Sequence, residues 1–366
     1  MNIECIKEKL VYAISKAERI TGKNITLPIL SCVLLEAHDS NLIIKATNLD
    51  IGVEITLPVK VVKPGIVAVS GSVLYNFISN ITNDKNITLE SVDGNLKVYT
   101  KHSESLIKAF PIDDFPSIPR VQSDTPFTLN IPNLLKGFKS VMYSSSVSTI
   151  RPVLSSILLA SEDDNVTFVA TDSFRLSEKR VSVKKPKEFT QILIPFKNIG
   201  EIIRTLEDIK EDVNVHLSEN QIAFSYNDIY LTSRVIDGVF PDYKQIIPKE
   251  VKTEVVLLKQ DFISSLRISN VFSDKFSQVT FHVSPNEKIF KITTKNMDIG
   301  ENVNKLDAVI KGEELTISFN YKYIIDCFQS IDSDSISLSF SDTSKPMIIR
   351  GVGDKSFLYL VMPMNK

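Results

Sequence analysis

LLEAHDSNLIIKATNLD, at residues 34–50, returns twice in altered form: as LLASEDDNVTFVATDSF at 158–174 and as FHVSPNEKIFKITTKNMD at 281–298. Each copy reads as an apolar strand, a polar turn and a second strand that ends in Thr and a polar tail. Thr47, Thr171 and Thr294 mark the same point of the pattern and stand one domain length apart. The period is too long for a solenoid, so the repeat predicts three similar domains in tandem.

An amphipathic helix is expected before each of these hairpins, and a second helix after it. Apolar residues at spacings of three and four predict the first set at 6–20, 132–143 and 259–268. The second set is expected at 70–81, 195–208 and 320–331, with Ser72, Pro195 and Asn320 as start signals.

A strand pair around a tight turn closes each unit. The turns contain Asp93-Gly94, Asn227-Asp228 and Gly353-Asp354. Alternation of apolar and polar residues in these strands is typical of sheets with one buried face. We therefore predict an α+β fold of three tandem similar domains, each with two helices packed on antiparallel sheets, at 1–121, 126–248 and 253–366.

The composition is that of an ordinary globular protein, with 43% hydrophobic and 23% charged residues in a chain of 366. No apolar run approaches the ~20 residues of a membrane-spanning helix, and the N-terminus lacks the apolar segment of a signal peptide. The sequence therefore predicts a cytoplasmic protein with no membrane partner. Cys5, Cys32 and Cys327 lack disulfide or metal-ligand spacing, so we expect buried free thiols and no cofactor.

The charge is unevenly distributed along the chain. The net charge is −2, which by itself argues against a nucleic-acid-binding protein. The predicted helices nevertheless carry more basic than acidic residues. Basic helices that face DNA attract phosphates without sequence preference, and an acidic exterior limits non-specific adhesion. Solvated lysines on ordinary surface helices give the same pattern, so both interpretations stay open.

Five blocks of the sequence resemble the bacterial beta sliding clamps, the beta subunits of DNA polymerase III. The blocks are PILSCVLLEA at 28–37, RPVLSSILL at 151–159, VATDSFRLS at 169–177, FPDYKQIIP at 240–248 and YLVMPM at 359–364. They stand in the order of that family, and the resemblance covers the whole chain. It implies the DNA-clamp fold and a ring-shaped head-to-tail homodimer around a central hole.

The resemblance implies a processivity factor and not an enzyme. Members of the family encircle double-stranded DNA without sequence preference and tether the catalytic subunit of the replicative polymerase. An ATP-dependent clamp loader opens the ring, and other proteins with a clamp-binding motif dock on it. Tethering acts as effective concentration, which raises apparent affinity ~10²–10⁴-fold without new contacts.

The same resemblance implies how the ring closes. An edge strand around Ser105–Lys108 would pair with the third domain of a second chain. Leu106 and Ile107 are the expected contacts on one side, and Val271 and Phe272, at a helix end, on the other. Such pairing covers two exposed strand edges.

The family docks short peptides in a groove between its second and third domains. Carried over position by position, the resemblance assigns to this groove Arg151, Leu154, Thr171, Ser173, Phe174, Arg175, Leu176, Pro241, Gln245 and Ile246. The third domain adds Phe276, Asn320, Tyr323, Ser344, Pro346, Leu360, Val361, Met362, Pro363 and Met364. Aliphatic and Met side chains suit an adaptable apolar pocket, while Arg and Asn hold a peptide backbone. Taken singly, Leu176 and Val361 fit a plain core position equally well.

Three positions depart from the family pattern. Phe174 stands where His is usual, Gln245 stands where a basic residue is common, and Asn365-Lys366 replace an Arg-containing end. These changes predict a more apolar groove with fewer cationic anchors and a different peptide preference.

The resemblance places DNA contacts in the loop Thr21–Thr26, where Lys23 and Asn24 would reach the duplex. Helical cations are further candidates, with the rotation of each helix left open: Lys7, Lys16, Arg19, Lys136, Lys139, Lys197, Arg204, Arg267 and Lys322.

No catalytic constellation stands out in the sequence. It contains no G-x-x-x-x-G-K-[ST], H-E-x-x-H or G-x-S-x-G motif. The four histidines are expected in strands or turns, without a nearby Ser or Cys partner. Asp113-Asp114 and Asp163-Asp164 fit solvated loops better than metal sites. Two alternatives remain from other classes: a hydrolase or transferase with a shallow site between domains, and an adhesive scaffold with peptide grooves but no closed ring.

Overall fold

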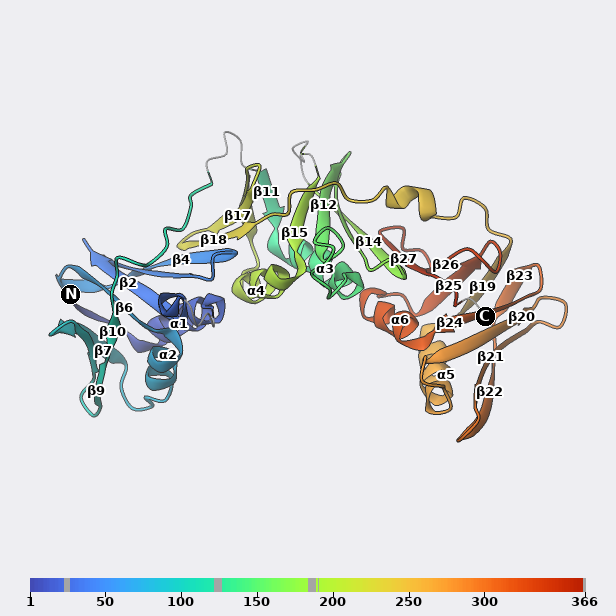
Figure 1. Cartoon of the computed structure of the whole chain (residues 1–366), viewed down its shortest axis with the longest axis horizontal. Helices are drawn as coiled ribbons and strands as arrows, with labels where there is room; N and C mark the ends of the chain where they lie inside the picture. Colours follow the sequence, from blue (N-terminus) through green and yellow to red (C-terminus); the bar gives the residue numbers. More distant parts are fainter. Residues whose placement is uncertain (23–26, 122–126, 184–188, 190, 365–366) are drawn as a thin grey trace. The chain divides into compact units, whose positions relative to one another are not determined.

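The computed structural model describes residues 1–366 except 23–26, 122–126, 184–188, 190 and 365–366 (Figure 1). The chain forms two compact units. The first unit is Met1–Pro132 with Lys197–Val235, and the second unit is Asn133–Phe196 with Ile236–Lys366. The domain predicted at 126–248 is therefore divided between both units. None of the described helices is long and apolar enough to cross a membrane.

Two antiparallel sheets make up the first unit. The five-stranded sheet has the order β5 (Lys60–Lys63), β1 (Asn2–Ile6), β7 (Asn86–Val92), β8 (Asn95–Tyr99), β9 (Glu104–Ile107). The nine-stranded sheet has the order β10 (Ala109–Phe110), β6 (Gly65–Ser70), β2 (Cys32–His38), β3 (Asn41–Thr47), β4 (Ile51–Pro58), β18 (Ile229–Arg234), β17 (Gln221–Tyr226), β16 (Asp212–Leu217), β11 (Phe127–Asn130).

Two further antiparallel sheets make up the second unit. The nine-stranded sheet has the order β15 (Ile192–Pro195), β12 (Ser156–Glu162), β13 (Asn165–Thr171), β14 (Arg175–Ser182), β27 (Phe357–Val361), β26 (Met347–Gly351), β25 (Ser335–Phe340), β19 (Thr253–Leu258), β23 (Val309–Gly312). The four-stranded sheet has the order β22 (Gly300–Leu306), β21 (Ile289–Asn296), β20 (Gln278–Ser284), β24 (Leu315–Asn320).

The same series of pairings occurs three times along the chain. One series is β2–β3–β4, repeated as β12–β13–β14 and β20–β21–β22; the other is β7–β8–β9, repeated as β16–β17–β18 and β25–β26–β27. Successive repeats are joined by strand pairing, β4 with β18 and β14 with β27. The predicted three-domain antiparallel fold is confirmed, while the boundaries 1–121, 126–248 and 253–366 stay predictions.

The described α-helices come in pairs, one pair to each repeat. The first members are α1 (Lys7–Ile20), α3 (Ile131–Val141) and α5 (Lys259–Val271), and the second members are α2 (Gly71–Ser79), α4 (Phe196–Leu206) and α6 (Tyr321–Ile325). Short 3-10 turns lie at Pro28–Ser31, Met142–Ser144, Tyr243–Ile246 and Asp326–Ser330. The helix predicted at 320–331 therefore changes to a 3-10 turn halfway along.

The predicted helix start is correct at Asn320 and wrong at Ser72. The Asn320 side chain accepts a hydrogen bond from the Lys322 backbone N–H at 2.8 Å. In α2 it is Ser70 whose hydroxyl accepts from the Val73 N–H, at 3.5 Å. Ser72 lies one residue inside the helix, where its side chain is no longer in the capping position.

Thr294 does not occupy the position of Thr47 and Thr171. The Thr47 hydroxyl donates to the Ile51 carbonyl at 2.9 Å, and the Thr171 hydroxyl donates to the Arg175 carbonyl at 2.7 Å. Thr294 donates instead to the Ser269 carbonyl of α5, at 2.9 Å. The third hairpin turn, Pro285–Lys288, is longer than the first, so the match of letters is shifted against the strand register.

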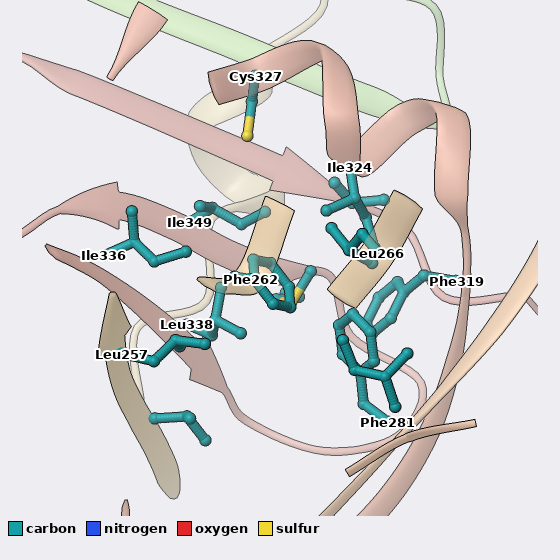
Figure 2. Packing of buried hydrophobic residues seen from close by; sticks show 14 of the residues in the cluster. Leu257, Phe262, Leu266, Phe281, Phe319, Ile324, Cys327, Ile336, Leu338 and Ile349 are labelled. Carbon is teal, nitrogen blue, oxygen red and sulfur yellow. The ribbon is translucent and has the colours of Figure 1, made fainter. Parts of the chain in front are cut away.

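Aromatic and aliphatic side chains pack together in the core of the second unit, where Phe262 and Leu266 of α5 meet Phe281 and Phe319 of the four-stranded sheet (Figure 2). Phe262 is fully buried, and its ring contacts Phe281 and Phe328 edge-on with centroids 5.7 Å apart in both cases. Edge-on rings add to the free energy gained by burial. This packing fixes α5 against the four-stranded sheet.

Gly137 in α3 provides a direct test of this close packing. A Cβ atom on Gly137 would stand 2.4 Å from the ring of Phe168, which is itself 1% exposed and packs edge-on against Phe138. We expect Gly137→Ala to lower the free energy of unfolding by ~1–3 kcal/mol through overpacking, although Ala favours a helix. Urea unfolding measures the change.

Gly200→Ala in α4 is the matched control. A Cβ atom there would meet the Arg204 guanidinium at 3.3 Å, the mobile end of an exposed side chain. This substitution should leave stability unchanged or raise it by ~0.5–1 kcal/mol. Equal effects of the two substitutions would contradict the packing argument.

Candidate functional site

The loop after β13 forms a rigid turn that presents Phe174 to solvent. The Thr171 hydroxyl closes the turn, and it also accepts a hydrogen bond from the Ser173 N–H at 3.2 Å. The Asp172 carboxylate accepts from the Phe174 and Arg175 N–H groups at 2.9 and 3.0 Å. Ser173 has a positive φ of 77°. As a result, the Phe174 side chain points outward and is 58% exposed.

Tyr323 of α6 contacts the side chains of both Phe174 and Arg175. Its ring stacks on Phe174, with centroids 6.1 Å apart and planes 15° from parallel. The Arg175 guanidinium lies 4.9 Å from the same ring. Stacking and a cation–π contact therefore join the second repeat to the third at this point.

Arg175 is mostly buried and bonds to two carboxylates. Its Nε lies 3.0 Å from Asp172, and its Nη1 bonds to Asp326. Burial alone would lower the pKa of Arg175, but Tyr359, Asp326 and Asp172 outweigh that effect and raise it above the ordinary value. Arg175 is thus a charged tie beneath the loop and has little surface left for a ligand.

The C-terminal strand runs along this loop. In the register of β14 and β27, Arg175 pairs with Val361 and Leu176 pairs with Leu360. Beyond the strand, the Met362 N–H donates to the Phe174 carbonyl at 2.8 Å. The motifs ATDSFRL and YLVMPM, far apart in sequence, are therefore neighbours in the sheet.

An open groove of about 520 Å³ lies next to Met362 in the second unit. Five of the predicted peptide-binding residues line it: Gln245, Ile246, Ser344, Pro346 and Met362. Ile246 is 47% and Met362 36% exposed, so apolar surface is available there. Lys249, Lys252 and Asp342 also line the groove and were missed, because solvated charged loops give no signal in the sequence.

Three predicted contact residues prove to be core residues. Leu176 is 1%, Leu360 2% and Val361 0% exposed. Leu176 and Leu360 belong to a buried cluster with Phe240 and Tyr243. Val361 belongs to the separate cluster that contains Phe262 and Phe281, because successive side chains of a strand point to opposite faces and both faces of β27 are covered. Thr171 and Pro346 are buried as well.

The other predicted groove residues lie around this centre. The Asn320 amide donates to the Phe276 carbonyl at 3.1 Å, and the Phe276 ring is 57% exposed. Arg151 and Pro241 are exposed, whereas Leu154, Pro363 and Met364 are half-buried. For Arg151, Leu154 and Pro241, no described side-chain contact joins them to Phe174, Tyr323 or Met362.

The predicted DNA-binding cations differ in availability. Lys16 is 3% exposed, and its ammonium donates to the Thr205 carbonyl at 2.6 Å and lies 3.1 Å from Asp208. The prediction that Lys16 meets DNA is therefore wrong for this structure, because α1 turns that side chain toward α4. Lys7 is half-buried and donates to the Ile81 carbonyl at 2.6 Å.

The remaining cations fall into a paired and an unpaired set. Lys136 pairs with Asp332, Lys197 with Asp50 and Arg204 with Glu201. Of the predicted DNA-binding cations in the described part of the chain, four are exposed and form no ion pair: Arg19, Lys139, Arg267 and Lys322. Lys23 and Asn24 lie outside the described residues.

The predicted dimer residues divide in the same way. Leu106 on β9 is 61% exposed and Val271 at the end of α5 is 64% exposed. Ile107 is only 7% exposed, because it faces the core of the first unit, and Phe272 is half-buried.

The expectation that no histidine has a Ser partner is wrong for His216, because its Nε2 lies 2.8 Å from the Ser225 hydroxyl, across the β16–β17 strand pair. Burial raises the pKa of Cys5 to about 12 and that of Cys32 to about 11, so these thiols are poor nucleophiles. All three cysteines are free and buried, as predicted. Among the residues that the structure describes, no group of three or more His, Cys, Asp or Glu side chains is placed to hold a metal ion.

Known proteins similar to this chain cover nearly its whole length. Three family models match in series: the DNA polymerase III beta subunit N-terminal domain over residues 1–119, its central domain over 128–242 and its C-terminal domain over 244–365. The beta sliding clamp of Synechococcus elongatus is 24% identical, with 100% of this chain and 99% of that protein covered. The beta sliding clamp of Staphylococcus epidermidis is 26% identical, with 93% of each covered.

Solved structures agree with this assignment. The DNA polymerase III beta subunit of Thermotoga maritima superimposes with a TM-score of 0.94 at 26% identity, covering 100% of this chain and 99% of that one. The DNA polymerase sliding clamp of Bacillus subtilis has the same fold, with a TM-score of 0.95, 23% identity and the same coverage. By the order of its repeats, the geometry at the β14–β27 joint and these matches, the chain belongs to the DNA polymerase III beta subunit family, the beta sliding clamps.

Proposed function

We propose that this chain is a DNA sliding clamp. Two copies close head to tail into a ring around double-stranded DNA, and the ring tethers the replicative polymerase and other proteins without chemistry of its own. The observation that carries the proposal is the threefold series of strand pairings, matched to the beta-subunit family over nearly the whole chain. Among the described strands, β9 at the beginning of this series and β22 at its end stand at the edges of their sheets.

The two unpaired strands support a head-to-tail contact. Within the chain, β18 and β27 pair with β4 and β14. β9 is the copy of β18 and β27, β22 is the copy of β4 and β14, and each stands at the edge of its sheet. Pairing β9 of one copy with β22 of another completes the series. A head-to-tail contact used twice closes a ring and leaves neither edge exposed.

The proposal includes the surroundings of such a ring. An ATP-dependent loader opens it, the polymerase catalytic subunit and other proteins with a clamp-binding motif dock on it, and it works in the cytoplasm without a membrane partner. The groove beside Phe174 and Met362 is the proposed docking place, because exposed apolar and aromatic side chains gather there on a rigid backbone.

The docking groove leads to a prediction about Phe174. Replacing this exposed ring by His removes apolar contact and adds a polar group, so Phe174→His should weaken the binding of a clamp-binding peptide roughly fivefold, or about 1 kcal/mol. Fluorescence anisotropy with one labelled peptide measures the affinity. Tyr12→His, an exposed aromatic change in the first unit, is the control and should change nothing. Unchanged affinity for Phe174→His would remove Phe174 from the docking site.

The sorting of the cations leads to a second prediction. Lys139→Ala and Arg267→Ala should each weaken DNA binding and reduce the salt dependence, by about 0.9 in the slope of log K against log salt for each lost phosphate contact. Lys16→Met should leave DNA binding unchanged and lower the free energy of unfolding, because Asp208 and the Thr205 carbonyl lose their partner. A DNA-binding defect in Lys16→Met with native stability would overturn this sorting.

Topology gives the decisive test of the clamp itself. Labelled protein is loaded onto circular DNA with its cognate loader and ATP, and retention is followed before and after the circle is cut once. We expect rapid loss on cutting, because a threaded ring slides off a free end. Equal retention on circular and linear DNA would indicate ordinary adhesion and would exclude the clamp.

A further inference from the structure

The two joints inside the chain share one geometry, which indicates how the third joint is built. At the first joint Val53 of β4 pairs with Leu231 of β18, and at the second joint Ser177 of β14 pairs with Tyr359 of β27. The row of paired residues that starts at Leu231 runs across its sheet to Phe127. The row that starts at Tyr359 runs across its sheet to Val255. Phe127 and Val255 each stand four residues before the start of a helix. In the first repeat, Ile3 stands four residues before the start of α1. Its row of paired residues ends at Ser105 on β9.

The opposite strand is located in the same way. Glu54, Glu178 and Val303 occupy the same position of the three repeats. Their rows of paired residues end at Ala68, Leu193 and Ser318, respectively. Each of these three end points stands three residues before the start of a helix. One residue earlier in each strand stand Val53, Ser177 and Asn302. Asn302 of one copy is therefore the counterpart of Val53 and Ser177, and Ser105 of the other copy is the counterpart of Leu231 and Tyr359.

Charged pairs cross both internal joints, in addition to the strand pairing. In the first unit Lys16 lies 3.1 Å from Asp208, and Lys197 lies 2.6 Å from Asp50. In the second unit Lys136 lies 2.6 Å from Asp332, Lys179 lies 3.8 Å from Asp354, and Arg175 bonds to Asp326. Each pair joins one repeat to the next.

None of these ties has a charged counterpart at the third joint. Counted from the helix start, Lys16 corresponds to Ile268 and Lys136 to Ser264; counted along the strand, Arg175 corresponds to Gly300 and Lys179 to Asn304. On the facing helix α2, the counterparts of Lys197 and Asp326 are Ser72 and Asn76. These replacements are uncharged: one is the apolar Ile268, and the others are Ser, Asn or Gly. Exposed apolar side chains lie on the same two helices, because Ile268 is 50%, Val271 64% and Val73 51% exposed.

We infer that the joint between two copies is an apolar and amide seam without ion-pair ties, in the register that places Ser105 opposite Asn302. This inference rests on the proposed homodimer. Glu104, Glu301 and Lys305 lie near the seam, but they stand on the solvent face of the strands, where ion pairs contribute little. We therefore expect the strength of this seam to depend little on salt concentration.

The register is tested by cross-linking. Ser105→Cys combined with Asn302→Cys in full-length protein should form an interchain disulfide under mild oxidation, visible on a denaturing gel without reductant. Cys5, Cys32 and Cys327 are buried and do not compete. Ser105→Cys with Asn304→Cys is the control, because the offset of two residues keeps the same face. Cross-linking of the control in preference to the test pair would overturn the register.

The chemistry of the seam is tested by the dimer Kd at low and high salt, from sedimentation equilibrium. Between roughly 0.1 and 0.5 M NaCl the Kd should change less than about threefold, because few charges are left to screen. Counted from the helix start, Asn83 is the counterpart of Asp208. Ile268→Lys with Asn83→Asp therefore imports an ion pair at the position of Lys16–Asp208 and should make the Kd rise with salt. A wild-type Kd that rises tenfold over this range would overturn the claim that the seam lacks ion pairs and would leave the homodimer standing. A chain that is monomeric at all salt concentrations would overturn the proposed homodimer together with it.

Discussion

Edge-to-edge pairing of antiparallel strands between successive repeats is the interaction on which the rest of this structure depends. A strand edge exposes a row of backbone N–H and C=O groups that must find partners or remain in water. β4 satisfies those of β18, and β14 satisfies those of β27, so each nine-stranded sheet contains strands of two repeats. The boundary between the compact units therefore falls inside the predicted central domain. Each half of that domain shares a continuous sheet with a neighbouring repeat.

The same backbone geometry carries different side chains at the two joints. The Arg234 N–H donates to the Asp50 carbonyl as the Met362 N–H donates to the Phe174 carbonyl, at 2.8 Å in both cases. Above the first joint is a pocket of about 230 Å³ lined by Asp50, Thr232 and Arg234. At the second joint the corresponding residues are Phe174, Leu360 and Met362. The two joints therefore share their backbone hydrogen bonds, while the side chains at the second joint are apolar where those at the first joint are polar or charged.

Helix rotation decides which basic residues remain available at the surface. Lys16 and Lys139 look alike in sequence, as cations on amphipathic helices. In the structure Lys16 is buried against α4, whereas Lys139 is exposed. A rotation of one residue position separates the two outcomes, and the apolar stripe of a short helix does not define rotation to that accuracy. A count of basic residues on helices therefore overstates the surface that DNA can meet.

The sequence by itself determined the class of fold, the number of repeats and the motifs that meet at the β14–β27 joint. These follow from local patterns: apolar spacing, turn residues and short blocks that do not depend on distant contacts. Only the tertiary structure decided that Thr294 is not the counterpart of Thr171, that Leu176, Leu360 and Val361 belong to the core, and that Lys16 is a tie between repeats. Each of these depends on strand register or on which neighbour a side chain faces. The strand register and the direction in which a side chain points are set by pairing between segments far apart in the chain, so no local pattern contains them.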